Sequence, residues 1–351
     1  MTLPLDKRDL DHILEHATPQ FVELSEGRLF LTGATGLFGS WLLESIAHAQ
    51  LELGLKFDVQ FLSRDPDRFL AQYPFLKTIH RLSGLRGDIR NFTVPDGSTF
   101  THMIHGATTS ARETFDGESP LRKYDTVAGG TRQLLEFASL ANAENVLYLS
   151  SGAVYGAKRL CEAGLIAENF AEAPDPTSEG SALGVAKRSA EFFCRAWCSD
   201  SAARSVKIAR CFSFVGPRIP LDIHYAVGNF IRDGLANRDL RITGSGRDVR
   251  SYLYMADLIT WLLKILTSKD KFNVYNVGSE NGNSISDLAQ QVAALFPGNL
   301  KVEFDQNKNT DEIRSPSFYV PSTERVRAAL GVAEYVGLMD ALNRTIRYHS
   351  R

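Results

Sequence analysis

The chain has 351 residues, of which 44% are apolar and 23% are charged, and its formal net charge at pH 7 is -2. This is ordinary globular composition. The length exceeds what one core of typical size needs, so we expect one large domain and a smaller lobe. The nearly balanced charge gives no electrostatic reason to expect nucleic acid or a membrane surface as a partner.

Residues 1–27 are rich in charge where a signal peptide would be apolar, and no apolar run in the chain reaches a membrane-spanning length. Within this segment Leu10, Ile13 and Leu14 recur at helical spacing, which predicts a short amphipathic helix packed on the body. We expect a cytoplasmic protein in a reducing compartment.

The four cysteines form no C-x-x-C motif and no cluster with histidine, so no metal site is expected. Cys194 and Cys198 are four residues apart in a predicted helix and share one of its faces. Together with Cys161 and Cys211 they are interpreted as buried apolar side chains.

A glycine-rich turn follows the first strand signal. The apolar run at residues 29–31 enters Gly33, Gly36 and Gly39 at spacing G-x-x-G-x-x-G, and a helix is predicted from about Trp41 to His48. Between a strand and a helix, such glycines permit a sharp turn, the approach of a pyrophosphate and close packing of helix on strand. The free N–H groups of the helix N-terminus suit phosphate. The pattern predicts a dinucleotide site, with a purely structural turn as the alternative.

Strand and helix signals then alternate, which is typical of a parallel sheet covered on both faces. The further predicted strands are Val59–Leu62, Met103–His105, Val146–Leu149 and Val206–Ala209, and the predicted helices lie near 41–50, 124–140 and 181–199.

After about residue 216 the pattern changes. A helix near 225–236, a short strand at Leu240–Thr243 and a glycine-rich turn suggest a lobe that covers a substrate. The predicted parts are an N-terminal helical extension (1–27), a dinucleotide-binding domain (28–215) and a mainly substrate-binding lobe interleaved with it (216–351).

A series of motifs from about residue 28 to the C-terminus resembles the extended short-chain dehydrogenases, which are NAD(P)-dependent nucleotide-sugar epimerases, dehydratases, decarboxylases and reductases. The motifs are TGATGLFGS (32–40), GDI (87–89), HGATT (105–109), YLSSGAVYG (148–156), Gly-x-x-Lys (184–187), RCFSFVGPR (210–218), RSYLYMADL (250–258) and YNVGSE (275–280). The resemblance implies an α/β fold: a doubly wound parallel sheet of Rossmann type with a smaller mixed C-terminal substrate lobe. It also implies an NAD or NADP cofactor and a nucleoside-diphosphate sugar as substrate.

The resemblance assigns cofactor positions along the carboxyl ends of the strands. These are Gly33, Thr35, Gly36, Leu37 and Phe38 in the phosphate loop, Asp88 and Ile89 beside the adenine, and Ala107 and Thr108 beneath the nicotinamide ribose.

The second strand ends in Ser63 and Arg64, where an NAD-specific site usually has a carboxylate for the ribose 2′-hydroxyl. An arginine suits a 2′-phosphate instead. Asp65 lies one residue further and could still reach the ribose, and Arg64 could equally be a solvated surface residue, so NAD and NADP both remain open.

Catalysis in the family uses a Ser or Thr, a Tyr, and a Lys four residues after the Tyr. Ser151 and Lys187 match the first and last of these, but Leu183 occupies the tyrosine position. Leucine has no proton to exchange, and loss of a general base typically costs about 10²–10⁴-fold in rate. The alternative is that Leu183 is only a core residue of its helix.

The two positions after Ser151 narrow the reaction. The family's 4,6-dehydratases carry Asp and Glu there, and its decarboxylases keep the Glu, whereas this chain has Gly152 and Ala153. Neither residue moves a proton, so an epimerase or reductase is favoured over a dehydratase or decarboxylase.

Two residues are candidates to replace the tyrosine. Tyr155 is near in sequence, and His224 has an unperturbed pKa near 6.5 that suits proton transfer. Structural or surface roles are the alternatives for both. Ser110, Thr109 and Tyr225 are further residues expected to edge the sugar pocket.

The substrate side has its own matches. Asn229 and Phe230 resemble the residues that bind the nucleotide base and phosphate, and Arg250 matches the arginine that clamps the diphosphate. Arg218, Ser213 and Thr109 are further substrate-binding candidates.

The leading interpretation is a nucleotide-sugar epimerase, or a related isomerase or oxidoreductase, with an altered acid/base set. The alternatives are a non-catalytic protein that binds NAD(P) and a nucleotide sugar, and a non-redox lyase or isomerase with structural NAD. A homodimer is expected through the helices near 124–140 and 181–199. Phe137, Phe192, Phe193 and Trp197 supply apolar area there, although they could equally belong to the core.

Overall fold

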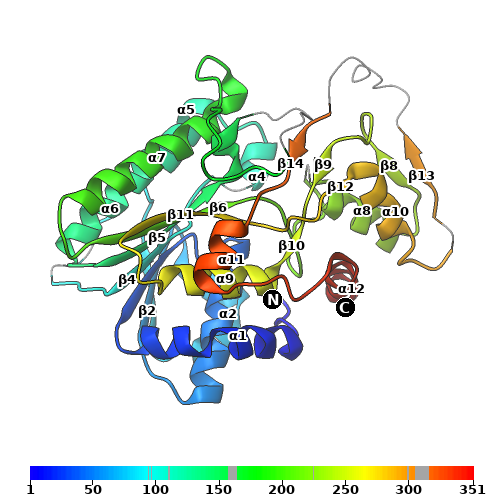
Figure 1. The fold of residues 1–351 in the computed structure, drawn as a ribbon. Coiled ribbons are helices and arrows are strands. Elements are labelled where there is room, and N and C mark those ends of the chain that lie inside the picture. The colour runs from blue at the N-terminus through cyan, green and yellow to red at the C-terminus, as the bar shows by residue number, and fades with distance from the viewer. Residues whose placement is uncertain are drawn as a thin grey trace.

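A parallel seven-stranded sheet forms the centre of the molecule (Figure 1). The computed structural model describes residues 1–93, 95, 97–109, 111–156, 164–223, 225–298, 300–304 and 316–351. The strand order is β11-β6-β5-β4-β1-β2-β3. The strands are β1 (Arg28–Thr32), β2 (Asp58–Ser63), β3 (Leu82–Arg86), β4 (His102–His105), β5 (Asn145–Ser151), β6 (Ser205–Cys211) and β11 (Phe272–Val277). Strand order reverses between β1 and β4, and ligands of such sheets bind outside the carboxyl ends at this point.

Helices cover both faces of the sheet because strands such as β4 are buried along their whole length. On one face lie α2 (Leu37–Leu53) and α9 (Met255–Leu266), and on the other lie α6 (Gly130–Leu140) and α7 (Ala182–Ser199). The shorter helices beside the sheet are α3 (Pro66–Gln72), α4 (Ala111–Phe115) and α5 (Pro120–Tyr124).

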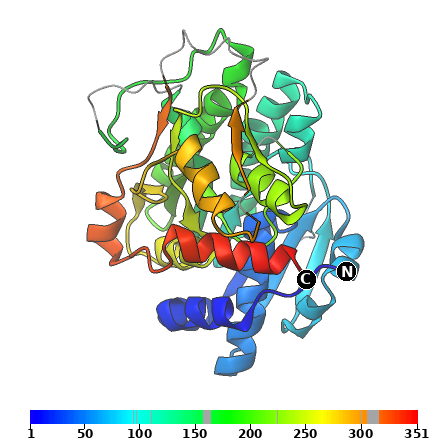
Figure 2. The same ribbon diagram turned by 90° about the vertical axis from the view of Figure 1, so that its right-hand side faces the viewer.

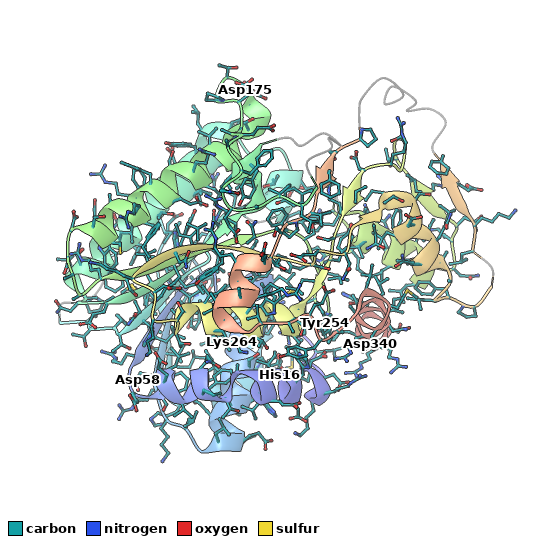
Figure 3. The ribbon with its side chains drawn as sticks, in the orientation of Figure 1. His16, Asp58, Asp175, Tyr254, Lys264 and Asp340 are labelled. Atoms are coloured by element: carbon teal, nitrogen blue, oxygen red, sulfur yellow. The ribbon has the colours of Figure 1, made fainter. Side chains whose placement is uncertain are left out.

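The N-terminal helix α1 (Lys7–Ser25) packs on α2 and α9 as an outer layer. Its buried Asp9 accepts hydrogen bonds from Tyr254, at 2.7 Å, and from Arg344, at 2.6 Å. Tyr254 is labelled in Figure 3. These contacts attach α1 to two segments of the lobe that are far apart in sequence, and the helix is longer than the sequence predicts.

A smaller lobe lies beyond the carboxyl edge of the sheet, and Figure 2 shows α12 running across it beneath α8 and α10. Its strands are β7 (Phe214–Val215), β8 (Leu240–Ile242), β9 (Val249–Arg250), β10 (Leu253–Tyr254), β12 (Asn283–Ser284), β13 (Val302–Phe304) and β14 (Phe318–Tyr319). Its helices are α8 (Ala226–Leu235), α10 (Ile285–Ala293) and α12 (Leu338–His349), while α11 (Glu324–Leu330) packs on β11.

The predicted fold class and the five predicted sheet strands are confirmed. Two strands were not predicted: β3, which is mostly exposed, and β11, which lies beyond residue 216 yet joins the main sheet. The predicted helix at 124–140 is interrupted, because a π-helical segment, Asp125–Gly129, separates α5 from α6.

The cysteines Cys194, Cys198 and Cys211 are free and buried, as predicted, while Cys161 lies outside the described residues. Among the residues that the structure describes, no group of three or more His, Cys, Asp or Glu could hold a metal ion. The same residues include no helix that is both long and apolar enough to cross a membrane.

Candidate functional site

The glycine turn after β1 has the geometry of a phosphate loop. Gly33 has φ 75°, and a Cβ there would lie 2.4 Å from the backbone carbon of Gly106. A Cβ on Gly39 would lie 2.4 Å from the Cα of Ala34, so α2 packs against the turn only with glycine at this position. Because α2 begins at Leu37, directly after Gly36, the free N–H groups of its first turn belong to the predicted phosphate loop.

A hollow continues from this turn along the carboxyl ends of β1, β2 and β4. Most residues of the predicted cofactor set line it: Gly33, Thr35, Ser63, Arg64, Asp88, Ile89, Ala107 and Thr108. Thr109, predicted on the substrate side, lines it too. Side chains that the motifs did not indicate complete it: Arg90, Glu113, Glu118, Arg122 and Thr126. The hollow, the glycine turn and the helix N-terminus fit a dinucleotide.

The end of β2 lacks the carboxylate that would recognise a ribose 2′-hydroxyl. The Asp65 side chain caps α3 by accepting a hydrogen bond from the Arg68 backbone N–H at 3.2 Å. The Arg64 guanidinium is largely exposed and lies 2.9 Å from Glu113. The Asp65 carboxylate is therefore engaged at the start of α3, while the Arg64 guanidinium lies beside the hollow.

Asp88 is ionised and paired. Its carboxylate accepts two hydrogen bonds from the Arg90 side chain, at 2.9 and 2.8 Å, and this pairing lowers its pKa to about 2. The neighbouring Ile89 is buried against Gly130 of α6, where a Cβ would lie 2.9 Å from Ile89 Cγ1. This packing fixes the wall of the hollow.

Buried hydrogen bonds fix the end of β4. His105 lies between Thr32 and Thr131, with ring nitrogens 2.7 and 2.9 Å from their hydroxyl oxygens. Burial lowers the pKa of His105 to about 3, so it stays neutral. The Thr32 hydroxyl also accepts from the backbone N–H of Ala107 at 3.2 Å, which positions the chain expected beneath the nicotinamide.

Lys187 of α7 bonds to β5 two residues before Ser151, the last residue of that strand. The Ser151 Oγ accepts from the backbone N–H of Ala153 at 3.1 Å. The Lys187 Nζ donates to the Leu149 carbonyl at 2.6 Å and lies 4.7 Å from the centre of the Tyr148 ring. Burial lowers the pKa of Lys187 to about 8.

Leu183 lies in the first turn of α7, one helical turn before Lys187. It is half-buried and packs with Tyr124 and Phe193 against a cluster of Val127, Ala128 and Ala186. Thus the position that bears the family's proton-transfer group is occupied by apolar packing.

Tyr155, predicted as a possible replacement for that group, is held in a buried hydrogen-bond network. Its hydroxyl donates to Asn276 at 2.7 Å and accepts from Arg210 at 2.8 Å, and the side chain is buried. Burial raises its pKa although Arg210 opposes this shift. Tyr155 is therefore structural. His224 and Ser110 lie outside the described residues.

The residues predicted around the nucleotide have different environments. Asn229 is half-buried on α8, where its side-chain oxygen accepts from Arg232 at 3.2 Å. Phe230 is 2% exposed and packs within the main core. Ser213 is half-buried between β6 and β7, and its carbonyl accepts from the Leu253 backbone N–H at 3.1 Å.

Arg218, predicted on the substrate side, is bonded within the protein. Its guanidinium is buried against Glu44 of α2 at 2.5 Å and donates to the Leu3 carbonyl at 3.0 Å. It also lies over the rings of Tyr73 and Phe75. Arg218 thus joins the lobe to α2 and the N-terminal segment.

Arg250 stands at the inner edge of the lobe with a residue that the sequence did not indicate. Its Nη1 donates to the Val249 carbonyl at 2.8 Å and its Nη2 to the Ser317 hydroxyl at 2.9 Å. The guanidinium carbon lies 5.7 Å from the centre of the Tyr319 ring. Tyr319 lies next to Ser151, because its hydroxyl is 2.4 Å from where a Cβ on Gly152 would lie.

Residues 29–278 match the model of the NAD dependent epimerase/dehydratase family, so the chain belongs to that family, whose cofactor is NAD. UDP-glucuronic acid decarboxylase 1 of Danio rerio is 27% identical over 66% of the chain and 53% of its own length. UDP-glucuronic acid decarboxylase 6 of Arabidopsis thaliana is 23% identical over 91% of the chain and 87% of its own length. The chain spans about half the length of the first of these relatives.

Solved structures share the fold. MoeE5 in complex with UDP-glucose and NAD has a TM-score of 0.72 at 23% identity, covering 92% of this chain and 98% of that one. A point mutant of UDP-glucuronic acid 4-epimerase from Bacillus cereus, in complex with UDP-4-deoxy-4-fluoro-glucuronic acid and NAD, has a TM-score of 0.74 at 22% identity. Its alignment also covers 92% of this chain and 98% of that one.

Proposed function

We propose that this protein is a nucleotide-sugar epimerase, or a closely related isomerase or oxidoreductase, that uses NAD and accepts NADP. The observation that carries the proposal is that Lys187 bonds to Leu149, two residues before Ser151 on β5, next to the strand whose end lines the glycine-rich hollow. Arg250 faces this edge from the lobe.

The chain's own residues have distinct parts in this proposal. The first turn of α2 and the hollow hold the dinucleotide, which when bound supplies reversible oxidation of a sugar carbon. Ser151 donates a hydrogen bond to the reacting sugar hydroxyl. Arg250 offers a guanidinium to the diphosphate of a nucleoside-diphosphate sugar.

The residues after Ser151 support an epimerase over a decarboxylase, although the two curated relatives carry decarboxylase names. Gly152 and Ala153 have no carboxylate, and the family's decarboxylases keep a Glu at the second position. Among structures of the same fold, the Bacillus cereus protein is a 4-epimerase. The reaction we favour therefore oxidises the hydroxyl at one sugar carbon and then reduces the same carbon back to a hydroxyl.

One observation supports a second function. Because Leu183 is an apolar packing residue, a non-catalytic protein that binds NAD(P) and a nucleotide sugar is the alternative. Proton NMR of the protein in heavy water, with NAD or NADP and a panel of UDP-, dTDP-, GDP- and CDP-sugars, separates the two. An enzyme gives a new isomer or deuterium at one carbon, whereas a binding protein gives saturation transfer without product.

We also propose a homodimer through α6 and α7. Phe137 and Trp197 are 5% and 6% exposed and belong to the core, which is one of the two alternatives left open by the sequence, so they contribute no interface area. Phe192 is 68% exposed and Leu121 and Leu140 are 78% and 82% exposed, and these supply the apolar surface instead.

A further inference from the structure

The phenol that the family places on α7 is missing here, but another phenol lies beside the same serine. Tyr319 belongs to β14, a two-residue strand paired in parallel with β9. It reaches the end of β5 from the lobe, about 170 residues after Ser151 in the chain.

Gly152 makes this approach possible. A Cβ on that residue would lie 2.4 Å from the Tyr319 hydroxyl oxygen and 2.7 Å from Cζ, closer than any real contact. The hydroxyl therefore occupies space that any other residue at 152 would fill. The Tyr319 phenol from the lobe fills the space that a side chain at position 152, directly after β5, would take.

The surroundings of the Tyr319 hydroxyl include polar partners. Burial raises the pKa of Tyr319, and Cys211 of β6 and Tyr155 act in the same direction. A side-chain hydrogen bond with Ser151 and the positive charge of Arg250 lower it. The residue as a whole is half-buried. Tyr155, the other phenol near this strand end, is bonded instead to Asn276 and Arg210.

We propose that the Tyr319 hydroxyl transfers the proton of the sugar hydroxyl held by Ser151, in place of the missing tyrosine at position 183. This inference rests on the function proposed above. The Tyr319 hydroxyl first releases its own proton to solvent, a loss that burial opposes and the charge of Arg250 favours. The sugar O–H bond then breaks and an O–H bond forms on the resulting phenolate oxygen. At the same carbon the hydrogen leaves with its electron pair to the oxidised nicotinamide, so that the sugar is oxidised to a ketone and the nicotinamide is reduced.

The first test removes the hydroxyl at position 319 and then places a tyrosine at position 183. Tyr319→Phe keeps the ring and removes the hydroxyl, and we expect kcat to fall about 10²–10⁴-fold. Tyr335→Phe, on an exposed ring stacked on His16, is the matched control and should not change kcat. Adding Leu183→Tyr to Tyr319→Phe should restore at least about tenfold of the lost rate.

Two results would overturn the inference. The first is a Tyr319→Phe variant with kcat within about threefold of wild type, far less than loss of a proton-transfer group costs. The second is a loss of rate that accompanies a lower thermal midpoint and is not rescued by Leu183→Tyr, because Tyr319 would then be only a packing residue.

A binding measurement tests the contact without turnover. Isothermal titration compares UDP-glucose with UDP-4-deoxyglucose on the NAD-loaded protein. If Tyr319 contacts the hydroxyl, the deoxy sugar binds about 2- to 10-fold more weakly to wild type and equally well to Tyr319→Phe. If the deoxy sugar binds more weakly by the same factor to wild type and to Tyr319→Phe, the role of Tyr319 is contradicted but the proposed function is not. A wild type that neither binds nor converts any nucleotide sugar contradicts the proposed function as well.

Discussion

Replacing Lys187 by methionine should abolish turnover and yet stabilise the fold at pH 7. The lysine is 4% exposed, and burial lowers its pKa from 10.5 to about 8. At about 1.4 kcal/mol per pH unit, keeping this cation buried costs roughly 3 kcal/mol. The hydrogen bond from its Nζ to Leu149 returns about 1.5 kcal/mol, so Lys187→Met should gain about 1–2 kcal/mol.

The sign of the pH dependence follows from the lower pKa in the folded state. Between pH 8 and 10.5 the unfolded chain holds the Lys187 proton and the folded protein does not, so wild-type stability rises with pH. The advantage of Lys187→Met should be full below pH 8 and should shrink by about 2 kcal/mol by about pH 9.5.

Urea unfolding of both nucleotide-free proteins at about pH 7 and about pH 9.5, followed by tryptophan fluorescence, measures this difference. Lys207→Met is the matched control, because burial also lowers the pKa of Lys207 to about 8 and its Nζ donates to the Ser205 hydroxyl at 2.8 Å. The control should show a similar pH effect and keep its activity. A Lys187→Met variant that is less stable than wild type at neutral pH, or a difference that does not change with pH, would refute the reasoning.

Three further outcomes are expected. Gly33→Ala places a Cβ at φ 75° against the chain after β4 and should abolish NAD binding in isothermal titration. The control Gly54→Ala has φ 66° but no atom within 4 Å of the new Cβ, so it should leave NAD binding unchanged. Equal effects of the two substitutions would contradict the assignment of the Gly33 turn to the phosphate loop. Arg64→Ser should weaken NADP about tenfold and leave NAD unchanged, and a parallel loss of both would show that Arg64 does not read the 2′-phosphate. Phe192→Glu should give a monomer by light scattering. The control Phe304→Glu changes a residue of the lobe that is 51% exposed and should leave the dimer intact. A dimer in both variants would place the interface elsewhere.

Local patterns predicted the sheet well because parallel strands and their turns are encoded over short stretches. The apolar runs that became β1, β2, β4, β5 and β6 are each bounded by turn residues, and the glycine spacing marks the β1–α2 junction. The strands β3 and β11 escaped prediction because neither is a continuous buried run: the first is mostly exposed and the second is half-buried at one end.

The site was less predictable because a motif gives a position and not the direction of a side chain. Arg218 and Phe230 match family positions, but the first bonds with Glu44 and the second packs in the core. Tyr319 was missed because its approach to Ser151 depends on the pairing of two short strands about 70 residues apart in sequence. The only sequence feature that accompanies it is the glycine at 152.

We propose that this chain oxidises and re-reduces a nucleotide sugar without a tyrosine at position 183. Stopped-flow measurement of the absorbance of reduced nicotinamide tests this, with the NAD-loaded protein mixed with the sugar that NMR identifies as its ligand. We expect a transient rise during the first turnover that is absent in Tyr319→Phe and returns when Leu183→Tyr is added. Product formation with no absorbance change, or tight binding with neither product nor absorbance, would contradict it.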